Sequence, residues 1–126
     1  MRATPKTVAI LLGGATLALL PSNAAGQFNN PPVTANDFAT TGRCGIVTKD
    51  VVANDSDPDG DYPLALTDVY YNGSKGTAFA VSSTSIEFES SGTTGTAAIS
   101  YTVSDSRGAT STGTFTVTIN SVFMCW

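Results

Sequence analysis

Hydrophobic residues stand at every second position in several short segments of the chain. Near the C-terminus, for example, Phe115, Val117 and Ile119 alternate with threonines. A period of two residues is typical of β-strands that bury one face. After the first 25 positions no sustained helical period of 3.6 residues occurs, so the pattern predicts an all-β domain.

Turn residues divide this part of the chain into seven expected strands. They cover residues 33–40, 46–53, 64–71, 77–81, 86–89, 99–103 and 115–119. The alternation changes phase between Leu66 and Val69, which predicts a β-bulge in the third strand. Seven short alternating strands in about 100 residues predict an antiparallel, immunoglobulin-like β-sandwich.

The first 25 residues have the three-part pattern of a secretory signal peptide. Arg2 and Lys6 form a positive start, an apolar run follows from Val8 to Leu20, and small residues around Ala25 suit cleavage. The apolar run is too short to span a bilayer, which argues against the alternative of an uncleaved anchor helix. Nothing later in the chain is apolar enough to span a membrane, so we expect no membrane insertion after cleavage. We therefore expect a signal peptide over 1–25, a flexible leader over 26–32 and the sandwich over 33–126. The protein should be secreted, either to the periplasm or to the extracellular space.

Composition excludes several classes of function. The chain of 126 residues has no His, which removes His-based catalysis and the usual zinc sites. A net charge of −4 argues against a nucleic-acid partner. Glu87 and Glu89 share one strand face, a spacing that a glycosidase could use. Because they alternate strictly with Ile86 and Phe88, we interpret them as a solvated face, and we expect no enzyme.

An acidic loop follows the second expected strand. Its four carboxylates, at every second position, repel one another unless a proton or a cation relieves them. Calcium takes six to eight oxygen ligands, so the ligand type fits, whereas Mg²⁺ rarely uses an all-protein cage. The alternative is a plain solvated turn, because Asn, Asp and Gly are common turn formers. The candidate ligands in the loop are Asn54, Asp55, Asp57, Asp59 and Asp61.

The spacing Asp-x-Asp-x-Asp-Gly also occurs at the start of an EF-hand loop. An EF-hand needs Glu at its twelfth position, which here is Leu66, so we reject that motif. In a sandwich, the start of the first strand and the connection between strands six and seven lie at the same end as the acidic loop. Topology therefore adds Asn36, Asp37 and Asp105 as candidate Ca²⁺ ligands.

The two cysteines, Cys44 and Cys125, form the pair expected in a secreted chain. Cys44 precedes the second expected strand and Cys125 follows the seventh, so both lie at the end opposite the acidic loop. We expect an intramolecular disulfide, with pairing between two chains as the alternative. The chain-entropy model gives such a closed loop about 4 kcal/mol as an upper value.

Three motifs in the expected order carry a family resemblance. Residues 51–61 read VVANDSDPDGD, residues 101–105 read YTVSD, and residues 32–37 read PVTAND. They resemble the bacterial Ig-like and cadherin-like domains of large surface adhesins. The resemblance implies a sandwich fold and places the calcium site of cadherin-like domains at the acidic-loop end. It also implies a non-catalytic module for cell adhesion or surface structure.

The partner expected for such a module is a protein or a glycan at the cell surface. A small carbohydrate-binding module is the alternative function. It predicts an exposed aromatic patch that includes Tyr70 or Tyr71, whereas the interpretation that the sequence favours for these two tyrosines is cross-strand packing.

Overall fold

The computed structural model describes residues 28–122 and Cys125. The predicted signal peptide and residues 26 and 27 lie outside the described residues. The described part contains strands and turns but no helix. The strands are β1 (Asp37–Gly42), β2 (Ile46–Asp50), β3 (Ala65–Tyr70), β4 (Gly76–Ala80), β5 (Ser85–Ser90), β6 (Gly95–Ser104) and β7 (Thr110–Asn120).

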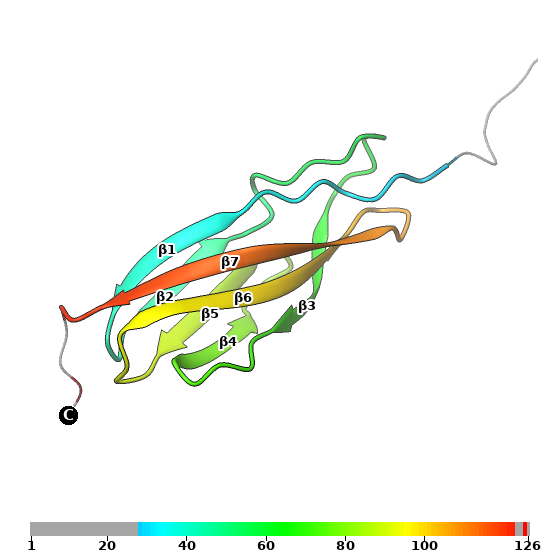
Figure 1. Ribbon diagram of the computed structural model, residues 1–126. Coiled ribbons are helices and arrows are strands. Elements are labelled where there is room, and N and C mark those ends of the chain that lie inside the picture. The colour runs from blue at the N-terminus through cyan, green and yellow to red at the C-terminus, as the bar shows by residue number, and fades with distance from the viewer. Residues whose placement is uncertain (1–27, 123–124, 126) are drawn as a thin grey trace, which may run out of the picture.

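The strands form two sheets that face each other, as Figure 1 shows. One sheet has the order β1-β7-β6-β3 and the other the order β2-β5-β4. The predicted β-sandwich is therefore confirmed. One pairing differs from a fully antiparallel arrangement, since β1 runs parallel to β7. The turn after β1 leads into β2 of the other sheet, so β1 makes no hairpin within its own sheet and lies along β7 in the same direction.

The core lies between the sheets and uses the alternating residues that the sequence indicates. Tyr101, Phe88 and Phe115 are the largest fully buried side chains. The register shifts between Leu66 and Asp68, which confirms the predicted bulge in β3. Glu87, on the opposite side of β5 from Phe88, points away from the core.

Two strand boundaries differ from the expected ones for local reasons. The first strand begins at Asp37 rather than 33, because Val33 makes an isolated bridge with Ser56 of the acidic loop. The second ends at Asp50 rather than 53. Asp50 Oδ1 accepts hydrogen bonds from the backbone amides of Val52 and Ala53, at 3.1 and 3.0 Å, and turns the chain there.

Cys44 and Cys125 form a disulfide in the structure, with their Cα atoms 5.6 Å apart. Cys44 lies in the turn between β1 and β2, and Cys125 follows β7. Figure 1 shows this end of the sandwich opposite the loop between β6 and β7. The disulfide ties the C-terminal segment to the turn that links the two sheets.

Candidate metal site

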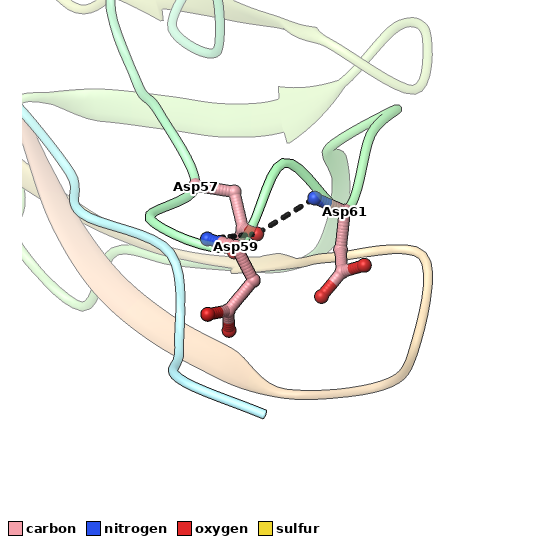
Figure 2. Close-up of side chains that lie close together, drawn as sticks. All are labelled: Asp57, Asp59 and Asp61. Atoms are coloured by element: carbon pink, nitrogen blue, oxygen red, sulfur yellow. Dashed lines mark hydrogen bonds between the residues drawn. The ribbon is translucent and has the colours of Figure 1, made fainter. Parts of the chain in front are cut away.

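Three carboxylates of the acidic loop point to one place (Figure 2). One oxygen from each of Asp57, Asp59 and Asp61 lies within 4.8 Å of the others. The loop curls because Asp57 Oδ2 accepts hydrogen bonds from the amides of Asp59 and Asp61, at 3.1 and 2.8 Å. Gly60 has φ of 75°, which favours glycine, and it completes the curl. In an extended strand, Asp57, Asp59 and Asp61 would lie in a row along one face. Here the turn brings their carboxylates together instead.

Asp57 is the buried member of this cluster. Its side chain is 7% exposed, and its Oδ1 atom has no hydrogen-bond partner among the described residues. A buried carboxylate oxygen without a partner is costly, and a cation is one way to satisfy it. Asp59 is exposed and Asp61 is half-buried, so the cluster opens toward solvent on one side. A hard cation with oxygen ligands fits this donor set.

The segment before β1 lies against the cluster, which sequence reasoning missed. Asn30 donates to Asp59 twice, from its backbone amide at 2.7 Å and from Nδ2 at 3.1 Å. The Asn29 side chain reaches both Asp61 and Asp105. The signal that could have found these residues is the Asn-Asn pair just before the first expected strand, which topology places at this end.

The amide of Asn29 has two orientations with opposite meanings. With Nδ2 turned toward the loop, it donates to Asp61 Oδ2 at 3.2 Å and to Asp105 Oδ2 at 2.9 Å. With the amide reversed, its oxygen faces these two carboxylate oxygens, which is unfavourable unless a cation or a proton lies between them, and Nδ2 lies 3.4 Å from Asp105 Oδ1. The protein without a cation therefore favours the donating orientation.

Asp105 lies beside Asp61, as topology predicts. Burial raises the pKa of Asp105, but hydrogen bonds from the amides of Ala109 and Arg107, both 2.9 Å, outweigh it and leave the pKa below its usual range. A guanidinium nitrogen of Arg107 lies 3.4 Å from Asp61 Oδ2. The loop between β6 and β7 thus adds one carboxylate and one cationic group to the rim of the site.

Asp37 and Asp55 form a separate, inner cluster around Tyr101. The Tyr101 hydroxyl lies 2.9 Å from Asp37 Oδ2 and 3.5 Å from Asp55 Oδ2. It also lies 3.3 Å from the carbonyl oxygen of Ala35 and 3.2 Å from that of Val51. Four acceptors surround one hydroxyl proton. Burial is the main cause that raises the pKa values of Asp37, Asp55 and Tyr101.

The eight predicted ligands are therefore divided between two places. Asp57, Asp59, Asp61 and Asp105 lie at the rim, whereas Asp37 and Asp55 point to Tyr101. Asn54 donates from Nδ2 to the carbonyl oxygen of Asn36 at 3.2 Å, and so links the loop to the residue before β1. These two asparagines hold the loop in place. The structure shows neither side chain contacting the rim carboxylates.

Comparison with known proteins places the chain in a family. Residues 29–118 match the family described as bacterial Ig domain. The chain belongs to the bacterial Ig domain family. This confirms the resemblance seen in the sequence. A search of curated proteins finds no match.

One solved structure shares the fold of this Ig domain, and a second gives a weaker match. A nucleoside hydrolase-related hypothetical protein from Saccharophagus degradans, described as associated with carbohydrate metabolism, is 20% identical with a TM-score of 0.54. The match covers 73% of this chain and 26% of that one. An endo-fucoidan hydrolase of glycoside hydrolase family 107 is 15% identical, with a TM-score of 0.48, over 92% of this chain and 16% of its own. The Ig domain therefore spans about a quarter of the first structure and less of the second.

Among residues 28–122 and Cys125, no helix has the length and apolarity needed to cross a bilayer.

Proposed function

We propose that this Ig domain is a secreted, non-catalytic module that binds Ca²⁺ through its acidic loop and serves in adhesion or surface structure. Family membership supports a surface module, because bacterial Ig domains are typically non-catalytic. The disulfide between Cys44 and Cys125 supports an oxidising compartment, outside the cytoplasm. The proposed partner is a protein or a glycan at the cell surface.

The observation that carries calcium binding is the rim cluster with its buried, unpartnered oxygen. Asp57 has a buried oxygen that no described residue satisfies, and one oxygen from each of Asp57, Asp59 and Asp61 lies within 4.8 Å of the others. Ca²⁺ accepts such irregular sets of carboxylate and amide oxygens, whereas Mg²⁺ demands near-ideal octahedral geometry. Charge favours a divalent ion, since one arginine is the cationic partner that the structure shows at these carboxylates.

Calcium would act here by holding three segments together. The acidic loop supplies three carboxylates, the β6–β7 loop supplies Asp105, and the segment before β1 supplies Asn29. When the Asn29 amide is reversed, its oxygen would bind the ion, and its nitrogen would no longer donate to Asp61 and Asp105. The ion would neutralise this end of the sandwich and strengthen the attachment of Asn29 and Asn30 to the loop.

Thermal unfolding of the oxidised protein in millimolar calcium and then in chelator tests this proposal. A ligand that binds only the folded state raises the free energy of unfolding, by about 2.7 kcal/mol when its free concentration is one hundred times Kd. The melting temperature rises with it. We expect a rise that the double variant Asp57→Asn/Asp59→Asn abolishes. The matched control is Glu87→Gln/Glu89→Gln, which removes the same charge from the outer face of β5 and should keep the rise.

Two results would overturn calcium binding at this loop. One is an unchanged melting temperature in calcium, with no heat of binding by titration calorimetry. The other is a rise that persists in the Asp57→Asn/Asp59→Asn variant, because the ion would then bind elsewhere.

A further inference from the structure

The outer face of the β1-β7-β6-β3 sheet has an unusual composition. Along β7, every outward position from 112 to 118 is threonine, while the residues between them point into the core. The register aligns three of these four threonines with hydroxyl groups of β6, since Thr112 pairs with Thr102, Thr114 with Ser100 and Thr118 with Thr96, whereas Thr116 pairs with Ala98. The centre of the face is therefore an array of hydroxyl groups interrupted at Ala98.

Two exposed aromatic side chains flank this array. Tyr70 of β3 is 59% exposed and lies next to Ser100, and Phe38 of β1 is 64% exposed and lies next to Thr116. They stand on the two edge strands, three strand spacings apart, or about 14 Å across the sheet. This span is larger than a single sugar ring. Tyr71, by contrast, packs edge-on against Phe88 with ring centroids 5.7 Å apart.

The face is almost free of charge. Of the ten carboxylates in the chain, Asp68 is on this face, and it pairs with Thr102. The four described lysines and arginines, at positions 43, 49, 75 and 107, lie in turns or in the other sheet. By contrast, the outer face of the β2-β5-β4 sheet carries Glu87 and Glu89. A face that needs only to stay soluble is usually charged, and two large exposed aromatics are costly there.

These features together select the chemistry of a partner. Without charge, the face offers nothing to nucleic acid or to an anionic polymer. With hydroxyl groups at its centre, it lacks the apolar core of a typical protein interface. Aromatic rings pack on the apolar faces of sugar rings, and hydroxyl groups exchange hydrogen bonds with sugar hydroxyls. The complementary partner is an uncharged, hydroxyl-rich chain.

We propose that this sheet face binds a neutral polysaccharide chain laid across the strands, with sugar rings against Tyr70 and Phe38 and sugar hydroxyls on the threonine rows. The site is separate from the acidic loop. It requires no calcium, so its test does not depend on the proposed calcium binding.

Retention of the whole oxidised protein on neutral polysaccharides tests the proposal. The probes are cellulose, β-1,3-glucan, xylan and mannan, with alginate as the anionic counterpart, each in the presence of chelator. We expect retention on at least one neutral probe, and a loss of affinity of about tenfold for Tyr70→Ala or Phe38→Ala, the scale of an interface anchor. Both side chains are exposed, so both variants should fold, and their thermal unfolding checks this.

The matched control is Phe79→Ala, which removes an exposed aromatic residue, 40% accessible, from the outer face of the other sheet. It should leave retention unchanged. The proposal is wrong if none of the neutral probes retains the protein, or if alginate retains it better. It is also wrong if folded Tyr70→Ala and Phe38→Ala proteins bind as the original does, or if Phe79→Ala weakens binding equally.

Discussion

The variant Asn29→Asp tests whether residue 29 acts as a hydrogen-bond donor or as a cation ligand, because aspartate can do only the second. Without a cation, the Asn29 nitrogen donates to Asp61 at 3.2 Å and to Asp105 at 2.9 Å. The aspartate has nearly the same shape but no donor, and it places a third carboxylate against the other two. When calcium is bound, residue 29 must supply an oxygen ligand. A charged carboxylate oxygen binds the ion more strongly than an amide oxygen does.

The expected loss without calcium follows from these two contacts. Each lost hydrogen bond contributes about 1 kcal/mol. Each new like-charge contact at this distance costs about 1 kcal/mol in a water-like dielectric. Two lost hydrogen bonds and two like-charge contacts together would cost about 4 kcal/mol. Because the exposed loop can relax, we expect the free energy of unfolding to fall by about half of this, ~2 kcal/mol. That loss lowers the melting temperature of a domain of this size by about 10 °C. In calcium this loss should largely disappear, and Kd should fall by about tenfold because the site gains a carboxylate ligand.

Thermal unfolding in chelator and in calcium, with calorimetric titration, measures both effects. Asn29→Leu is the control, because it removes the donor and the ligand oxygen together without adding charge. It should lower stability in chelator and also shrink the calcium-induced rise. If Asn29→Asp lowers the melting temperature equally with and without calcium, no cation reaches this side chain and the reasoning fails. If the original protein shows no rise at all, calcium binding itself is refuted.

Further predictions concern the remaining charged and cross-linking groups. Arg107→Gln removes a competing cation from the rim, so calcium should bind several-fold more tightly in titration calorimetry, while stability in chelator changes by less than about 1 kcal/mol; unchanged affinity would contradict this. Tyr101→Phe leaves buried acceptors without a proton and should cost about 3 kcal/mol in denaturant unfolding. Because burial raises the pKa of Asp37, its contribution to stability is greatest at low pH and is lost as the pH rises through that pKa. The melting temperature of the original protein relative to Asp37→Asn should therefore fall from about pH 4 upward. Replacing Cys44 and Cys125 by Ala should cost up to about 4 kcal/mol, and a protein that melts unchanged would show that the cross-link constrains little.

The sheet strands could be predicted from sequence because each buries one face and leaves the other in solvent. Phe115, Val117 and Ile119 report that environment at every second position, and the structure buries all three. The parallel pairing of β1 with β7 could not be predicted in this way. Alternation fixes which face of a strand is buried, but it carries no information on the direction of its neighbour.

The candidate site was predictable in composition and location, though not in detail. Asp55 and Asp57 are two positions apart and look equivalent in the sequence, yet one turns inward to Tyr101 and the other gathers the loop amides. That difference arises from the curl of the loop, which depends on contacts between distant segments. Asn29 and Asn30 were missed because their polar segment shows no alternation, and the signal it does carry, an Asn-Asn pair before the first expected strand, points to the site only through the topology.

The two clusters together explain how an acidic loop can be ordered before any ion arrives. The Tyr101 hydroxyl joins Asp37 of β1 to Asp55 at the start of the loop, and the amide of Ala35 donates to Asp55 at 2.9 Å. This inner cluster needs protons, and buried groups there keep raised pKa values. The rim needs positive charge, which asparagine amides and Arg107 supply weakly. Because the inner contacts already fix the loop, the rim carboxylates stand close together at an electrostatic cost that a divalent ion can remove. Binding of the ion would then require little rearrangement beyond reversal of the Asn29 amide. Substitution of Asn29 is therefore the most direct test of this mechanism.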